Sequence, residues 1–321
     1  MRKTGKSILI ATALIIIGAI IFMGGMAVNK WNFKELSTRK MQTVEHEITE
    51  NFTNICIIGS TEDIVFEVKN DENCKVVCFE ETNMVHTVSV EDGTLNVDVK
   101  DERSWLDYIG FNFSTPKITV YLPVGAYAEL KIKSDTGDVF LPAELEVGSI
   151  DVEVNTGDVD CKSSVAETIK IKTTTGNIKL TDVNAEFLDL AVSTGHITAS
   201  GINCAGDISM TVSTGKALLS DAKCTNLTST GNTGDITLEG VVVANKLSIE
   251  RTTGDVDLDD SDAGEIWIKT NTGDVEGTLL SEKIFITNTG TGSVEVPRST
   301  TGSVCEITTT TGDIEIDIKG E

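Results

Sequence analysis

Apolar and polar residues alternate along most of the chain, and the alternation restarts after each Thr-Gly pair. The stretch "VNTGDVD" at residues 154–160 is typical, and close variants such as "RTTGDVD" follow it. Steps of 19 or 20 residues, shortening to 10 near the end, separate the glycines of these pairs, which are Gly137, Gly157, Gly176, Gly195, Gly215, Gly234, Gly254, Gly273, Gly292, Gly302 and Gly312. A period of this length predicts a repeat architecture in which each unit packs on its neighbours.

Each unit carries apolar residues at two-residue spacing on both sides of its glycine. Ile169 and Ile171 precede Gly176, for example, and Ile178 and Leu180 follow it. A period of two is typical of a strand with one buried face, so each unit predicts two short strands. A small residue recurs ten positions before the glycine and predicts a tight inward corner; the set is Ala166, Ala185, Ala205, Cys224, Ala244 and Ala263.

Two architectures are compatible with this repeat. In an antiparallel meander, each Thr-Gly pair would be a hairpin loop. In a parallel β-solenoid the pair would be a corner, and equivalent residues would stack on successive coils about 4.8 Å apart. Stacking of coils explains why the same residue type returns at the same position of each repeat unit. A meander would require only that apolar and polar residues alternate. We therefore predict an all-β fold, a single-stranded parallel β-solenoid (β-helix) of 19–20-residue coils, with each glycine at a corner of positive φ.

Both ends of the repeat depart from this regularity. Ile284 and Ile286 lie one residue out of phase, and the final spacings of 10 resemble half-units, which predicts that the solenoid narrows or is capped there. Upstream, residues 54–70, 74–102 and 117–139 alternate as strands, with Asp92-Gly93 as a hairpin turn. An aromatic segment interrupts these strands and predicts either a hydrophobic plug or a candidate interaction loop, with Trp105, Tyr108, Phe111 and Phe113.

The N-terminal segment is apolar and has no charged residue from Ser7 to Val28. Its length matches the hydrocarbon core of a bilayer, about 30 Å, and predicts a transmembrane anchor. A cleaved signal peptide is the alternative, since Gly25-Met26-Ala27 offers small residues, but a typical apolar region of that kind has only about 7–15 residues. Basic residues flank the segment on both sides, so charge alone does not set its orientation.

These patterns together predict the domain organisation. The expected parts are a cytoplasmic tail at 1–6, a transmembrane anchor at 7–28, a juxtamembrane linker at 29–44, an N-terminal β cap with leading strands at 45–121, and the repeat solenoid with a C-terminal cap at 122–321.

The charge distribution excludes one class of partner. The formal net charge is −24, and the residues after position 40 hold 19 basic against 49 acidic side chains. Such a surface repels phosphate backbones and anionic lipid, so we expect no nucleic-acid partner and contact with the membrane only through the N-terminal helix.

The sequence also argues against an enzyme. Three histidines, His46, His86 and His196, lie in separate segments without a neighbouring ligand at metal spacing. Motifs of Ser hydrolases and P-loops are absent. We therefore predict a non-enzymatic protein with no catalytic, cofactor-binding or metal-binding residues, and no cofactor.

Aspartate is the commonest residue directly after the repeat glycine. The residues at this position are Asp138, Asp158, Asn177, His196, Lys216, Asp235, Asp255, Asp274, Ser293, Ser303 and Asp313. Stacked carboxylates about 5 Å apart repel by roughly 1 kcal/mol per pair in a water-like medium, and Ca²⁺ could bridge them. The interruption by Asn177, His196 and Lys216 relieves this repulsion without a metal, so we expect exposed, solvated aspartates.

We expect most of the cysteines to be free thiols. The seven are Cys56, Cys74, Cys78, Cys161, Cys204, Cys224 and Cys305. Most are expected to pack as compact hydrophobes, and Cys204 with Cys224, on adjacent coils, is the most suitable pair for a disulfide.

The order of these motifs resembles a known family. A polar strand pair, then "ITVYLPVGAYAELKIKSDTGDV" with Tyr121-Leu122-Pro123, then successive "TGDV" and "TGDI" units is similar to the bacterial β-strand-repeat family of unknown function labelled "putative adhesin". The resemblance covers about residues 45–321. It implies an extended β-helix-like module in Gram-positive envelopes, sometimes beside envelope-stress regulators, with no agreed activity and no catalytic residues.

Function is therefore expected to lie in the surface of the solenoid. The resemblance favours a membrane-anchored structural or interaction module, adhesin-like, with its C-terminal body outside the cell and an unknown protein or glycan at the cell surface as partner. An envelope-stress sensor or regulator acting through a membrane protein partner is the alternative.

Overall fold

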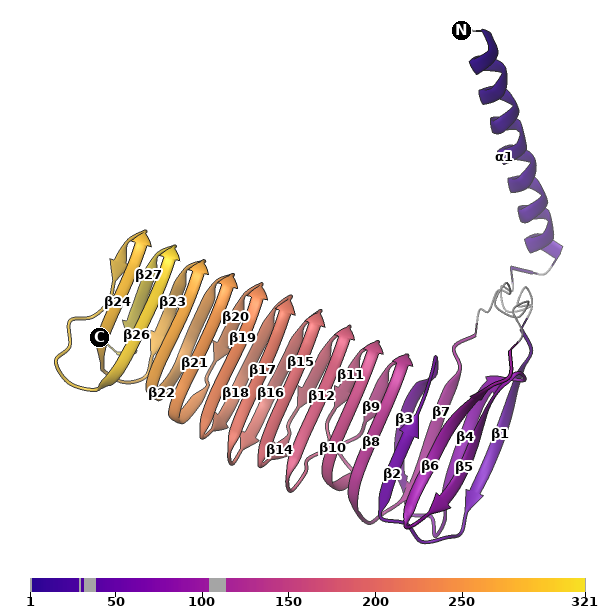
Figure 1. The fold of residues 1–321 in the computed structure, drawn as a ribbon, viewed down its shortest axis with the longest axis horizontal. Coiled ribbons are helices and arrows are strands. Elements are labelled where there is room, and N and C mark those ends of the chain that lie inside the picture. Colours follow the sequence, from indigo (N-terminus) through magenta and orange to yellow (C-terminus); the bar gives the residue numbers. More distant parts are fainter. Residues whose placement is uncertain (1, 29, 32–38, 104–113, 321) are drawn as a thin grey trace.

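The computed structural model describes residues 2–28, 30–31, 39–103 and 114–320. It begins with one helix, α1 (Arg2–Val28), and continues as an elongated stack of strands with the C-terminus near the far end (Figure 1). The 19 residues Ile10–Val28 have a mean hydropathy of 2.4. By length and composition this stretch is able to cross a membrane, and a signal sequence would share these properties.

Seven strands precede the regular repeat. They are β1 (Met41–Ile48), β2 (Asn54–Ile58), β3 (Asp63–Lys69), β4 (Cys74–Glu81), β5 (Met84–Glu91), β6 (Thr94–Asp101) and β7 (Lys117–Pro123). Strands β1, β4 and β7 pair antiparallel, and so do β5 and β6. Asp92 and Gly93 join β5 to β6 with φ of 49° and 75°, which is the two-residue hairpin predicted from the sequence.

The repeat forms two long faces of parallel strands. The first face contains β8 (Ala126–Thr136), β10 (Glu146–Thr156), β12 (Thr168–Thr175), β15 (Phe187–Thr194), β17 (Asp207–Thr214), β19 (Asn226–Thr233) and β21 (Val242–Thr253). The second contains β9 (Val139–Leu141), β11 (Val159–Cys161), β13 (Ile178–Thr181), β16 (Ile197–Cys204), β18 (Ala217–Cys224) and β20 (Ile236–Glu239), with the short β14 (Asn184–Ala185) beside β16. Strand β22 (Val256–Thr272) is long enough to contribute to both faces.

The solenoid prediction is confirmed by the strand register. Ile150 pairs with Ile169 and Val159 pairs with Ile178, each in parallel and one coil apart. Thr156 likewise pairs with Thr175, so like residues stack in columns. The side chains at the predicted inward positions fill one continuous core, whereas an antiparallel meander would require the opposite strand direction.

The last two coils do not stack in chain order. The final strands are β23 (Val275–Leu279), β24 (Lys283–Thr291), β25 (Val294–Glu295), β26 (Ser303–Thr311) and β27 (Ile314–Ile318). Strand β26 lies between β22 and β24, and β27 lies between β23 and β25. The outermost coil is therefore formed by residues 283–296, as Figure 1 shows, and the C-terminal residues expected to cap the end lie one coil further in.

A similar exchange occurs at the other end. Strand β2 lies between β6 and β8, and β3 pairs with both β7 and β9. The coil formed by β2 and β3 comes earlier in the sequence than both of its neighbours. It lies between the strands β6 and β7 on one side and β8 and β9 on the other. Because such a coil is hydrogen-bonded on both sides, neither exchanged segment is left with a free sheet edge.

Two expectations require correction, and one question that the sequence left open, the disulfide, is answered. Ala166, Ala205 and Ala244 are exposed, because Val165, Cys204 and Val243, one residue earlier, turn inward instead; Ala185, Cys224 and Ala263 are buried as predicted. All seven cysteines are free thiols, so Cys204 and Cys224 are not bonded to each other. Gly302 stands at a different corner from the other repeat glycines, with Glu282 as its neighbour.

Candidate functional site

Glycine forms one continuous column along the solenoid. Ten of the repeat glycines take part, with φ between +119° and +150°. A Cβ added at any of them would lie 1.8–2.2 Å from a carbonyl oxygen of the neighbouring coil. Positive φ and this close approach both exclude a side chain, so the column is the structural reason for the Thr-Gly repeat.

The residues after these glycines form a hydrogen-bonded ladder. Asp138 Oδ1 accepts the backbone N–H of Asp158 at 2.8 Å, and Asp158 Oδ1 accepts that of Asn177 at 2.7 Å. Asn177 Oδ1 and His196 Nδ1 continue the ladder to the next N–H groups, both at 3.0 Å. The side chains of aspartate, asparagine and histidine each carry a hydrogen-bond acceptor at the δ1 position. This explains why all three residue types occur directly after the repeat glycine.

This ladder changes the interpretation of the aspartates. Asp158 is exposed, as the sequence predicted, but its carboxylate satisfies a backbone donor and is not simply solvated. The backbone N–H and the side-chain hydroxyl of Ser293 lower the pKa of Asp313, and a hydrogen bond from Lys216 lowers that of Asp235. The column thus has a structural role that requires no Ca²⁺, and sequence reasoning missed it because the backbone partners come from the next coil.

A second corner column was also missed. Asp182, Gly201, Asp221, Gly240 and Asp260, each six residues after a repeat glycine, all have positive φ, between 47° and 66°. Asp and Gly are among the residues that tolerate this region best. Their alternation at a fixed phase is a signal in the sequence that could have located the corner.

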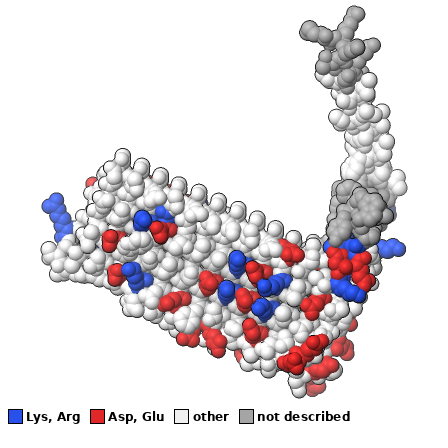
Figure 2. Space-filling view, viewed as in Figure 1, with Lys and Arg blue, Asp and Glu red and all other residues white. Residues whose placement is uncertain are grey.

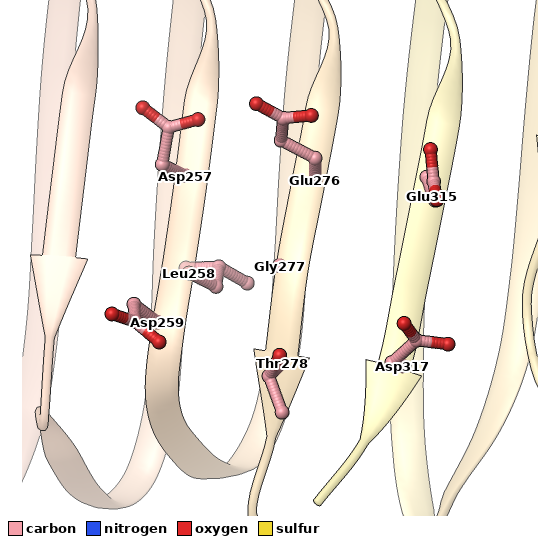
Figure 3. A pocket seen from close by; sticks show the side chains of 8 residues that line it. All are labelled: Asp257, Leu258, Asp259, Glu276, Gly277, Thr278, Glu315 and Asp317. Carbon is pink, nitrogen blue, oxygen red and sulfur yellow. The ribbon is translucent and has the colours of Figure 1, made fainter.

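An acidic groove of about 320 Å³ crosses the coils near the C-terminus (Figure 3). Asp257, Glu276 and Glu315 line one row across three neighbouring coils, and Asp259 and Asp317 lie below them. Gly277 also lines the groove, and a Cβ there would lie 1.9 Å from the carbonyl oxygen of Leu258 in the neighbouring coil, so glycine allows the two coils to approach. Burial and then the charge of Asp257 raise the pKa of Glu276, so these carboxylates repel one another.

Part of the exposed surface of the outermost coil is apolar. The exposed apolar side chains of this coil and its neighbour are Ile284 (38%), Ile286 (55%), Val294 (41%) and Val304 (39%). Ile284 pairs with Val304 across β24 and β26, so the phase slip seen in the sequence turns two isoleucines outward. Figure 2 shows acidic side chains gathered over the N-terminal strands and few of them at this end.

The edge of this coil is open. Within the described part of the chain, β24 pairs with β26 alone, which leaves one side of the strand without a partner. Its sequence from Ile284 to Val294 contains no charged residue and no proline. Charges, prolines and bulges are the usual protection of an edge strand against pairing with another chain, and the one charge in β24 is the buried Lys283 at its first position.

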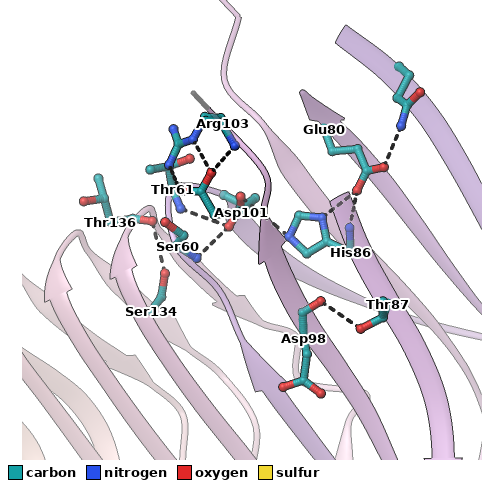
Figure 4. Close-up of polar contacts among 12 residues, drawn as sticks. Ser60, Thr61, Glu80, His86, Thr87, Asp98, Asp101, Arg103, Ser134 and Thr136 are labelled. Carbon is teal, nitrogen blue, oxygen red and sulfur yellow. Dashed lines mark hydrogen bonds and ion pairs between the residues drawn. The ribbon is translucent and has the colours of Figure 1, made fainter. Parts of the chain in front are cut away.

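A buried polar cluster lies inside the N-terminal strands (Figure 4). Glu62, Cys78, Glu80 and His86 are each at most 5% exposed. His86 Nδ1 lies 2.7 Å from Glu80 Oε2, and His86 Nε2 lies 3.6 Å from Glu62 Oε1. Burial opposes the charging of His86, but the two carboxylates prevail and raise its pKa.

Two expectations from the sequence concern these regions. No metal-ligand set was expected, yet Cys78, Glu80 and His86 each offer a ligand atom, and these atoms lie within 4.8 Å of one another. The fold brings them together because β4 and β5 form a hairpin, which sequence spacing did not reveal. The candidate interaction loop with Trp105, Tyr108, Phe111 and Phe113 lies outside the described residues.

One family model covers most of the chain. The model described as "Toastrack DUF4097" matches residues 52–213 and again residues 202–321. No curated protein matches the chain.

Several solved structures are similar over nearly their full length. A "putative adhesin" from Bacteroides fragilis NCTC 9343 is 13% identical, with 88% of this chain and 98% of that one covered and a TM-score of 0.38. A "putative adhesin" from Parabacteroides distasonis ATCC 8503 is 15% identical, with 87% and 98% covered and a TM-score of 0.49. A "putative lipid binding protein" from the same organism is 14% identical, with 87% and 98% covered and a TM-score of 0.39.

Proposed function

The chain belongs to the Toastrack DUF4097 family, and from this premise we propose that it is a membrane-anchored, non-enzymatic interaction module. Its solenoid would hold a protein-binding end away from the membrane at the cell surface. The observation that carries the proposal is the open edge of β24 on the outermost coil, a strand whose exposed part carries no charge.

The arrangement of the two ends supports this role. Helix α1 adjoins the N-terminal strands, and β24 lies at the opposite end of the stack (Figure 1). Ten stacked corner glycines at about 4.8 Å per coil give roughly 40 Å of regular solenoid between them. Parallel hydrogen bonds along both faces resist bending, so the separation of the ends is fixed.

The chemistry of the outermost coil favours a protein partner. An extended segment of the partner would pair with the free backbone groups of β24, and its apolar side chains would cover Ile284 and Ile286. A second copy of the same chain is disfavoured, since each body carries a formal charge near −30 after residue 40. We therefore infer a different protein, with apolar residues in an extended segment.

Photocrosslinking in intact cells tests this proposal. A photoreactive residue at Ile286 should yield a specific adduct with another protein, and the same residue at Phe187, which is 43% exposed on β15, should not. Equal adducts at both positions, or none at Ile286, would contradict it, and an adduct between two copies would show self-assembly instead.

The topology is tested separately. Protease treatment of intact cells should remove the body after residue 40 and leave α1 in the membrane fraction. A body protected until the cells are lysed would place it on the inner side, and release of an intact body would indicate a cleaved signal sequence.

A further inference from the structure

The first coil of the stack has a glutamate at the corner where later coils have the repeat glycine. A Cβ at Gly137 would lie 2.2 Å from the carbonyl oxygen of Glu62, just as one at Gly157 would lie 2.1 Å from that of Gly137. Asp63 Oδ1 accepts the backbone N–H of Asp138 at 3.0 Å, so the aspartate ladder also begins at this corner. The glycine column therefore ends in a residue with a side chain, and Glu62 is only 2% exposed.

This buried side chain meets two of the N-terminal strands. His86 of β5 lies between Glu62 and Glu80 of β4, with Nδ1 2.7 Å from Glu80 Oε2 and Nε2 3.6 Å from Glu62 Oε1. Glu62 Oε2 also accepts the backbone N–H groups of Ser60 and Thr61, and Glu80 Oε2 accepts that of His86. The corner of the first coil, β4 and β5 are thus joined through one imidazole ring.

The contact distances assign the protons of this ring. The 2.7 Å from Nδ1 to Glu80 Oε2 is a hydrogen bond that joins the two groups directly, so Nδ1 carries a proton and donates it. Nε2 is buried and has no hydrogen-bond partner among the described residues. In a neutral ring its lone pair would face Glu62 Oε1, which is repulsive. A proton on Nε2 turns this contact into an ion pair, so the geometry favours a charged ring.

The other titratable groups around the ring provide no second cation for the carboxylates. Burial raises the pKa of the Cys78 thiol to about 12, so this thiol is neutral. Asp101, at the end of β6, forms an ion pair with Arg103 at 2.7 Å (Figure 4). The contact from β1 comes from Gln42, which is uncharged. Loss of the ring proton of His86 would therefore leave two buried carboxylates with no cation between them, which is strongly unfavourable.

We propose that His86 makes the attachment of this corner to β4 and β5 dependent on pH. The charged ring holds residues 59–62 in place, and the neutral ring releases them while the strands on both faces of the solenoid stay paired. The corner lies at the end of the solenoid that adjoins the N-terminal strands. The pH response is thus separate from the proposed partner-binding end.

The directions of two pKa shifts give the pH range of the attachment. Burial opposes the charge of His86, but hydrogen bonds to Glu62 and Glu80 raise its pKa. Its contribution is fully present below about pH 6.5 and is lost as the pH rises through the raised pKa. Burial likewise opposes the charge of Glu62, but hydrogen bonds from His86 and Ser60 lower its pKa. This second contribution is present above about pH 4.3 and is lost as the pH falls, so the corner is held best between these two limits.

Histidine NMR of the full-length protein in detergent measures the charge of the ring. The chain has three histidines, and the variants His46→Gln and His196→Gln assign the signal of His86 by elimination. We expect this signal to titrate at a higher pH than the histidines of the same chain in urea. Glu62→Gln should lower the pKa of His86, whereas Glu153→Gln, which removes an ion-paired glutamate on the solenoid face, should leave it unchanged. A ring that titrates at or below the value in urea would overturn the proposal.

Amide exchange of the wild-type protein measures the release of the corner. Ser60 and Thr61 report on it because both donate to Glu62, and Asn177, which donates within the aspartate ladder of a later coil, is the control. After correction for base catalysis, the opening constant of the two corner amides should rise by up to tenfold per pH unit above about pH 6.5. It should level off above the pKa of folded His86, while the opening constant of Asn177 stays constant.

Two outcomes of the exchange experiment would refute the control of the corner by the ring. One is an equal rise at the corner amides and at Asn177, which would indicate general loosening of the solenoid. The other is a constant exchange at the corner while His86 loses its proton. Both are read from the wild-type protein, so they decide even if Glu62→Gln fails to fold.

Discussion

Replacing Gly195 by alanine tests the physical basis of the solenoid, because one methyl group meets two separate penalties. Gly195 has φ of +140°, a conformation that costs a residue with a Cβ about 1–3 kcal/mol. The new Cβ would also lie 1.9 Å from the carbonyl oxygen of Gly176 in the neighbouring coil. Since unstrained contacts of carbon are about 3.5 Å, the two coils must separate at this corner.

The separation breaks ladder hydrogen bonds on both sides of the corner. Gly176 N–H donates to Thr194 O, and Gly195 N–H donates to Thr214 O, both at 3.0 Å. Each such bond contributes about 1 kcal/mol. Together with the φ penalty, the expected loss of unfolding free energy is about 3–5 kcal/mol, which is a large share of the 5–15 kcal/mol typical of a whole domain.

Guanidinium unfolding followed by circular dichroism measures this loss. The matched control is Gly125→Ala, because no atom lies within 4 Å of a Cβ at Gly125 and its φ is outside the left-handed region. Hydrogen exchange should show the greatest loss of protection in the two coils that meet at Gly195. A Gly195→Ala variant as stable as its control, or within about 1 kcal/mol of it, would refute the explanation of the repeat glycine.

Three further predictions follow from named contacts. Asp158→Ala should lower the unfolding free energy by about 1 kcal/mol, because a backbone N–H of the next coil loses its acceptor, whereas Asp158→Asn should be neutral; an equal loss in both would assign the effect to charge. The hydrogen bond from Lys216 lowers the pKa of Asp235, so the contribution of ionised Asp235 to the unfolding free energy is present above about pH 4 and is lost as the pH falls further. In Asp235→Asn the unfolding midpoint should therefore fall less between about pH 4 and lower pH than in the wild type. An unchanged dependence of the midpoint on pH would contradict the role of Asp235. Lys283→Met should lower the unfolding free energy by about 1–3 kcal/mol, because the partly buried carboxylate of Asp262 loses its cation and the carbonyl of Ala263 loses a donor. Exchange protection should then fall first in β24, and protection lost first elsewhere would refute a role of Lys283 in holding this strand.

The candidate sites differ in whether the residues that form them are close together or far apart in the sequence. The corner role of the glycines was predictable because each one repeats a local conformational demand. The aspartate ladder was not, since the acceptor on Asp138 serves an N–H twenty residues later. The buried cluster needed the hairpin of β4 and β5 to bring Cys78, Glu80 and His86 together. The outward turn of Ile286 was visible as a phase slip, but its position on the outermost coil was not.

The sequence by itself determined the all-β class, the parallel coil and its length, because a period of two set the buried face and a recurring glycine set the corner. These properties depend on each residue's own conformational preferences and on its nearest neighbours along the chain. Only the tertiary structure decided the stacking order at the two ends, where β2 and β26 are inserted between strands that are not their sequence neighbours. The physical reason is that every coil presents the same backbone ladder to both sides, so hydrogen bonding alone accepts several orders, and packing at the ends selects one.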